Sequence, residues 1–116
     1  MTTAKEATRR KGGQAAHASD LRIERRKGIV LLTLARPDRR NSLSEAMLHA
    51  LQAAIAEAGA DPTVRAVVLA AEGPVFCAGH DLKELTAHRT DADGGRAFTE
   101  SLMRLCSTVM QAIRGE

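Results

Sequence analysis

Residues 76–83 hold the backbone and side-chain groups best suited to chemistry. Ala78 and Gly79 have almost no side-chain bulk, so another molecule can approach the backbone closely there. His80 follows at the start of an expected helix, where backbone N–H groups have no partner within the helix and lie at the positive end of its dipole. The segment therefore predicts an anion site, suited to a phosphate or to the oxyanion of a reacting carbonyl.

Other chemistries of the same region are weaker alternatives. Cys77 is a candidate nucleophile, but no base is identifiable near it, which favours a small buried residue. His80, Asp81 and His88 lie close together, but their spacing matches no standard zinc site, and no metal is expected. Cys77 and Cys106 are far apart in sequence, so reduced thiols are favoured over a disulfide between them.

A β-hairpin is the first element expected to support this segment. Residues 21–25 alternate apolar and charged side chains, as a half-buried strand does, and residues 29–34 are almost continuously apolar. Lys27 and Gly28 supply the turn between them. Pro37 then ends the second strand because it lacks a backbone donor.

A helix follows the hairpin. Ser42 and Glu45 have the spacing of a capping box, and either Ser42 or Ser44 can begin the helix. One apolar face recurs at three- and four-residue intervals: Met47, Leu48, Leu51, Ile55 and Ala58. Gly59 is expected just beyond the helix end, and Asp61-Pro62 prevents continuation.

The second half predicts a strand, a loop and helices. Residues 64–70 form a β-branched run typical of a strand covered on both faces, and residues 75–79 a short loop or strand. Residues 81–88 suit one or two helical turns, before a polar stretch at 89–95. A final helix is expected to place six apolar residues on one face: Phe98, Leu102, Leu105, Val109, Met110 and Ile113. The fold class is therefore α/β.

Two motifs resemble those of the crotonase (enoyl-CoA hydratase/isomerase) superfamily. Residues 72–84 read Glu-Gly-Pro-Val-Phe-Cys-Ala-Gly-His-Asp-Leu-Lys-Glu, and residues 35–43 are similar to the family's Arg-Pro-x-x-x-Asn-(Ala/Ser)-Leu signature. The resemblance implies an incomplete crotonase-like ββα superhelix. Residues 21–116 would be the N-terminal part of an acyl-CoA-binding domain, preceded by a disordered polar leader at 1–20.

The resemblance also implies roles for particular residues. The backbone N–H of His80 would be one of two oxyanion donors for the thioester carbonyl. Asp81, Leu82 and Lys83 would line the CoA pocket, largely through backbone atoms. The remaining pocket residues would be Ala78 near the adenine, and Arg39 and Arg40 near the phosphates and ribose.

In this family the second donor and the acid/base carboxylates come from later segments. Glu72, Asp81 and Glu84 do not occupy those catalytic positions. General acid/base catalysis needs a positioned group of suitable pKa. The 116-residue chain is therefore expected to be truncated and inactive as a hydratase by itself.

Length and composition limit the remaining function classes. The chain has 116 residues, enough for one domain, and a net charge of +3. Two Phe and no Tyr or Trp leave no aromatic platform for single-stranded nucleic acid, and no apolar run approaches the roughly 18 residues of a membrane span. Neither nucleic acid nor membrane is an expected partner.

The function predicted is thus that of an enoyl-CoA hydratase/isomerase-like protein of fatty acid metabolism, with a coenzyme A thioester as substrate and no other cofactor. The resemblance implies trimer-type homo-oligomers for full-length relatives. The cytoplasm is the expected location; because the first 20 residues faintly resemble a transit peptide, the mitochondrial matrix is the alternative. The alternative function is a non-catalytic interaction module, or an inactive fragment, that pairs with another chain through its terminal helix.

Overall fold

The computed structural model describes residues 20–115, so all but the last residue of the predicted leader lies outside the described residues. Strands β1 (Leu21–Arg26) and β2 (Ile29–Leu34) form the predicted antiparallel hairpin. Lys27 and Gly28 both have positive φ, at 27° and 85°. Two central residues of this kind match the right-handed twist of the flanking strands.

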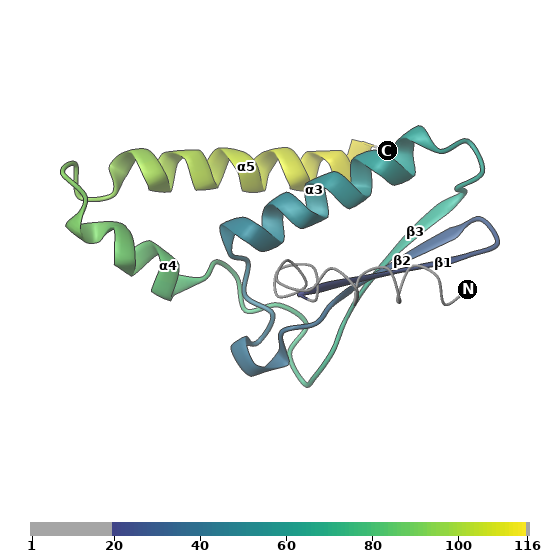
Figure 1. Ribbon diagram of the computed structural model, residues 1–116, viewed down its shortest axis with the longest axis horizontal. Coiled ribbons are helices and arrows are strands. Elements are labelled where there is room, and N and C mark those ends of the chain that lie inside the picture. Colours follow the sequence, from purple (N-terminus) through teal and green to yellow (C-terminus); the bar gives the residue numbers. More distant parts are fainter. Residues whose placement is uncertain (1–19, 116) are drawn as a thin grey trace, which may run out of the picture.

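The third strand, β3 (Ala66–Ala71), pairs in parallel with β2, giving the sheet order β1-β2-β3. Parallel neighbours need a crossover connection, and helix α3 (Glu45–Ala60) supplies it. Figure 1 shows α3 lying over the sheet, with the long helix α5 (Arg96–Gly115) beside α3 on the side away from the sheet.

Helix α3 confirms the predicted core face. All five predicted residues are buried, together with Ala54. Ser44, not Ser42, is the N-cap, and its side chain accepts a hydrogen bond from the Met47 N–H at 3.1 Å. The end predicted at Gly59 is wrong: the helix continues to Ala60, because Pro62 disfavours helical geometry only at the residue before it, Asp61.

Two short helical segments, α4 (Leu82–Ala87) and η3 (His88–Thr90), lead to α5. On α5, Leu102 and Val109 are buried and Phe98 and Leu105 are half-buried, as predicted. Met110 and Ile113 instead have 43% and 42% of their surface exposed. Within the described residues α5 packs chiefly along α3, and Met110 and Ile113 are not buried by that contact.

Strand β3 is not covered on both faces, contrary to the prediction. Its first three residues, Ala66–Val68, are exposed, and the last three are half-buried. The reason is that, in residues 20–115, α3 packs chiefly against β1 and α5 and leaves the start of β3 uncovered; β3 is also an edge strand with β2 as its single neighbour. Beside its first residues lies an open cavity of about 350 Å³, whose lining includes Ile55, Val67 and Ile113.

Candidate functional site

A single β-bridge fixes the backbone of the predicted oxyanion segment. The Leu43 N–H donates to the Gly79 carbonyl at 2.7 Å, and the Asp81 N–H donates to the Leu43 carbonyl at 3.1 Å, which makes the bridge partners Leu43 and His80. In this parallel pattern the N–H of His80 points away from Leu43. Among residues 20–115 it has no hydrogen-bond acceptor, so it is a free, oriented donor.

Gly79 gives this donor its accessibility. Its φ is +109°, a conformation that side chains rarely adopt, and a Cβ placed there would meet no atom within 4 Å. Glycine is therefore needed for the backbone shape, and the space beside it is open. A ligand can approach the segment from this side, as the small residues predict.

The helix N-terminus contributes differently from the prediction. Asp81 is the N-cap of α4, and its carboxylate accepts from the N–H groups of Lys83 at 3.0 Å and Glu84 at 3.3 Å. The N–H groups of Lys83 and Glu84, in the first turn of the helix, are thus taken by the protein's own carboxylate. These two N–H groups are therefore not available to an anion, whereas the N–H of His80 has no acceptor among residues 20–115.

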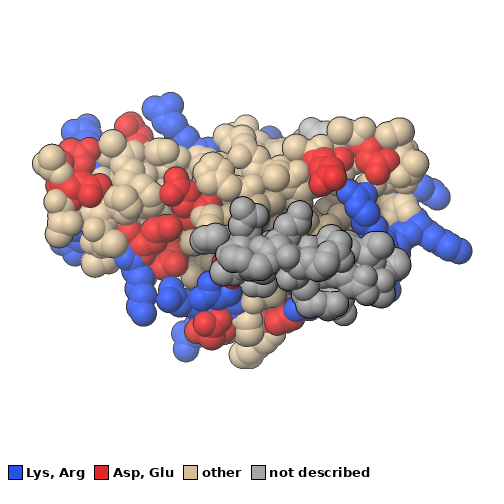
Figure 2. Space-filling model, in the orientation of Figure 1, with Lys and Arg blue, Asp and Glu red and all other residues tan. Residues whose placement is uncertain are grey.

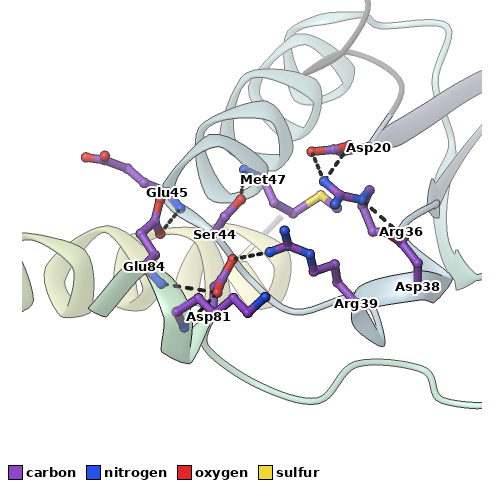
Figure 3. A network of polar contacts seen from close by, with 10 residues as sticks. Asp20, Arg36, Asp38, Arg39, Ser44, Glu45, Met47, Asp81 and Glu84 are labelled. Carbon is purple, nitrogen blue, oxygen red and sulfur yellow. Dashed lines mark hydrogen bonds and ion pairs between the residues drawn. The ribbon is translucent and has the colours of Figure 1, made fainter. Parts of the chain in front are cut away.

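The two carboxylates nearest to this donor are both engaged (Figure 3). Asp81 also lies 3.8 Å from the Arg39 guanidinium. Glu84 reaches across to α3, where its Oε1 accepts from the N–H of Glu45 at 2.8 Å. Each therefore orders a helix start in the structure.

Asn41 joins the two loops of the site; it is the Asn of the Arg-Pro-x-x-x-Asn signature, which by itself gives it no role. Its side chain is fully buried; Oδ1 accepts from the Arg36 N–H at 2.7 Å, and Nδ2 donates to the carbonyls of Glu72 at 2.9 Å and Val75 at 3.0 Å. Its φ is +53°. Asparagine is the residue type, after glycine, that best tolerates this region, and that is the signal in the sequence.

The predicted CoA-binding arginines lie beside the oxyanion segment. Arg39 ends the short helix η2 (Pro37–Arg39), and the carbonyl of Arg40 accepts from the Ala78 N–H at 3.0 Å. The side chains of both arginines are exposed, as are those of Leu82 and Lys83. The structure therefore brings together the two segments, 39–40 and 78–83, that hold the seven predicted site residues: Arg39, Arg40, Ala78, His80, Asp81, Leu82 and Lys83.

An ionic cluster holds the strand that precedes η2. The Arg36 guanidinium contacts both carboxylate oxygens of Asp20 at 3.3 Å and Oδ1 of Asp38 at 3.3 Å. The hydrogen bond from Arg36 lowers the pKa of Asp38, and the same bond raises the pKa of Arg36. Figure 3 shows this cluster and the Arg39–Asp81 pair in one view.

The weaker chemical alternatives gain no support from geometry. Cys77 and Cys106 are free, half-buried thiols that pack against the core. The His88 ring stacks on Phe98, with centroids 3.6 Å apart, and Nδ1 lies 2.8 Å from the Asp91 carboxylate. Among residues 20–115 no three His, Cys, Asp or Glu side chains gather as metal ligands would.

Surface charge and hydropathy bear on partners. On the face in Figure 2, acidic and basic side chains of the described residues are interspersed. Nucleic-acid binders instead carry clustered basic stripes. None of the helices described in residues 20–115 has the length and apolar character to cross a bilayer.

A hairpin, a crossover helix, a parallel strand and a loop with a free amide are the features of the crotonase fold class, and comparison with solved structures agrees. The crystal structure of enoyl-CoA hydratase from Mycobacterium smegmatis superposes with a TM-score of 0.71 and 49% identity, over 81% of this chain and 35% of that one. The crystal structure of human enoyl-CoA hydratase domain-containing protein 3 superposes with a TM-score of 0.71 and 35% identity, over 82% of this chain and 36% of that one.

A family model described as enoyl-CoA hydratase/isomerase matches residues 24–115, and the chain belongs to this family. The string from Ala78 to Glu84 is expected to resemble enoyl-CoA hydratase domain-containing protein 3, and relatives of that name are similar to this chain. The mitochondrial protein of Mus musculus is 40% identical over 105 residues, 88% of this chain and 33% of its own length. The chain spans about a third or less of the curated relatives it matches.

Proposed function

We propose that this chain binds acyl-CoA thioesters and that the His80 N–H receives the thioester oxygen. One observation carries the proposal: this amide has no acceptor within the described residues and is held by the Leu43 bridge, next in the chain to Gly79, where a Cβ would meet open space. A pre-oriented donor of this kind stabilises negative charge without reorganisation when the charge develops.

The reaction class proposed is hydration or isomerisation of an α,β-unsaturated thioester, as part of fatty acid metabolism. Both reactions place negative charge on the thioester oxygen, and loss of one donor typically lowers the rate by about 10²–10³-fold. Asp81 and Glu84 are engaged in helix capping, and Glu72 is paired with Arg22. We therefore expect the described residues to bind and orient the thioester, with acid/base carboxylates coming from other segments.

Three cations are available for the phosphates of coenzyme A. Arg40 and Lys83 are exposed, and Arg39 is exposed while contacting Asp81 at 3.8 Å. An exposed ion pair of this length contributes little, so Arg39 can turn to a phosphate at small cost. A coenzyme A thioester is thus the proposed ligand, with no further cofactor.

Calorimetric titration tests the proposal with two ligands that differ at one group. Butyryl-CoA has the thioester carbonyl, whereas S-butyl-CoA, a thioether, lacks it. We expect butyryl-CoA to bind about 2- to 10-fold more tightly, the value of one hydrogen bond. Equal affinities would remove the His80 donor from the proposal, and no binding of either ligand at millimolar concentration would remove the function.

For cellular location we propose the mitochondrial matrix over the cytoplasm. The mouse and human relatives are named as mitochondrial proteins. A fluorescent fusion of the whole chain, compared with one that lacks residues 1–20, tests this proposal. Equal cytoplasmic fluorescence from both fusions would contradict it.

A second candidate function, an interaction module, is favoured by the apolar stripe on α5. Met103, Met110 and Ile113 are 41–43% exposed. This stripe would pair with the same stripe of a second copy. Size-exclusion chromatography with light scattering distinguishes the candidates, because a monomer at all concentrations contradicts this second function.

A further inference from the structure

The imidazole of His80 carries an unusual nitrogen. Its Nδ1 is buried, and it has no hydrogen-bond partner; it is the sole buried side-chain nitrogen or oxygen of this kind among residues 20–115. Buried polar atoms without partners are rare in folded proteins, and each calls for an explanation such as a ligand or a functional role.

The bridge explains the direction of the ring, whose Nδ1 is buried while the residue as a whole is half-buried. Leu43 and His80 are direct partners in a parallel bridge, and paired residues direct their side chains to the same face. Leu43 is 9% exposed and belongs to the hydrophobic core. The imidazole is therefore directed toward apolar neighbours by the same contact that frees its backbone N–H.

Neighbouring polar groups do not satisfy the ring. Asp81 binds the N–H groups of Lys83 and Glu84 and lies near Arg39. Glu84 binds the N–H of Glu45. Neither carboxylate therefore hydrogen-bonds to Nδ1 of His80.

The backbone nitrogen and Nδ1 of His80 can contact one acyl group at two points, because their separation matches that of the two oxygens in a 3-hydroxyacyl group. Four bonds separate the backbone nitrogen of a histidine from Nδ1, so the two stay within about 5 Å in every rotamer. Four bonds also separate the thioester oxygen of an acyl group from a hydroxyl on its third carbon. Rotation about Cβ–Cγ, a torsion with broad preferences, exchanges Nδ1 with a ring carbon and can bring the nitrogen toward the ligand.

We propose that the His80 side chain is a specificity-determining residue that selects 3-hydroxyacyl thioesters through a hydrogen bond between Nδ1 and the hydroxyl. A hydroxyl both donates and accepts, so it satisfies Nδ1 in either tautomer of the neutral ring, whereas a saturated hydrocarbon chain does not. The proposal rests on the proposed acyl-CoA function, since hydration places a hydroxyl on this carbon.

Side-chain variants separate this role from the oxyanion role, because every residue at position 80 keeps the backbone N–H. The ligands are (S)- and (R)-3-hydroxybutyryl-CoA and butyryl-CoA, titrated calorimetrically into the whole chain. The wild type should prefer one hydroxyacyl form over butyryl-CoA by about 2- to 10-fold. His80→Phe keeps a ring without nitrogen and should lose the preference, so that its affinities for butyryl-CoA and for the hydroxyacyl forms become equal.

His80→Asn places an amide atom where Nδ1 lies and should retain much of the preference. His49→Ala, a change at an exposed position of α3, is the matched control and should behave as the wild type. A second readout is the ¹⁵N resonance of Nδ1, which should move with the preferred hydroxyacyl ligand and not with butyryl-CoA. A purely structural role for the ring would not produce that difference.

The outcomes separate the two levels of the proposal. If the wild type binds none of the thioesters, the proposed function fails and the selectivity falls with it. If it binds all of them and His80→Phe leaves the ratio of affinities unchanged, the selectivity is overturned and the function stands. If His80→Phe does not fold, an Nδ1 resonance that responds equally to butyryl-CoA and the hydroxyacyl ligands overturns the selectivity.

Discussion

Asn41 shows how one side chain can hold a site that it does not itself line. Its three hydrogen bonds connect the start of the 36–41 loop to the 72–75 loop, and those loops lead to Arg39 and Gly79. Neither loop forms a strand or an α-helix, so side-chain bonds replace the ladder that would otherwise fix them.

Asn41→Ala should therefore lower the free energy of unfolding by about 2–4 kcal/mol, because three buried backbone groups lose their partner. Asn41→Gly, which accepts the positive φ, should recover about 1 kcal/mol of this loss. Urea unfolding followed by circular dichroism measures both. Gln111→Ala, at an exposed position of α5, is the control, and an effect of Asn41→Ala as small as that control would contradict the account.

Asp81→Ala should cost about 1 kcal/mol of stability through loss of the α4 N-cap. Asp81→Asn keeps a capping oxygen, so its free energy of unfolding should fall by only about 0.3 kcal/mol. The 3.8 Å contact with the exposed Arg39, which this variant weakens, contributes little. If both variants lose the same stability in urea unfolding, the ionic contact rather than the cap is the important interaction.

Among the elements, α5 has a first turn whose stability depends on pH. Asp93 accepts hydrogen bonds from the N–H groups of Ala97 at 2.9 Å and Gly95 at 3.0 Å, which lower its pKa below the ordinary 3.8. The stabilisation is thus present above pH 3.8 and is lost as pH falls through the lower folded pKa.

The amide resonances of Gly95 and Ala97 should consequently titrate together below pH 3.8 as the first turn of α5 frays. Asp93→Asn keeps an acceptor without a titrating charge and should abolish this step, whereas Glu100→Gln on the same helix should not. Persistence of the step in Asp93→Asn would assign it to another group.

Local sequence patterns predict the helices and strands of this fold well, but they predict poorly which of their faces are buried. The hairpin and the buried face of α3 follow from apolar spacing within a few residues. The exposure of Met110 and of Val67 depends on which elements lie opposite them, which spacing does not encode. In the site, the motif locates His80, but its freed N–H depends on Leu43, 37 residues earlier in the chain (80 − 43).

At the scale of the whole molecule, β3 is the most exposed part of the sheet. Within residues 20–115 one side of this strand has no partner, and Val67 and Val68 are 45% and 44% exposed. Unpaired edge strands of this composition are templates for association, and charged residues on them suppress it.

Val67→Lys should therefore raise the concentration at which the chain begins to associate, with a stability change within about 0.5 kcal/mol. Dynamic light scattering over a concentration series measures the first effect and urea unfolding the second. Ala53→Lys, an exposed position on α3, adds the same charge elsewhere. Equal improvement by both variants would indicate a net-charge effect instead of edge pairing.

The central claim is that the His80 N–H receives the thioester oxygen of an acyl-CoA. The most direct measurement is the ¹H–¹⁵N resonance of the His80 amide during titration with butyryl-CoA and with S-butyl-CoA. The account predicts a downfield shift of the amide proton with the thioester and a much smaller shift with the thioether, which has no carbonyl oxygen to accept the hydrogen bond. A His80 amide that does not move while other resonances report butyryl-CoA binding would contradict it.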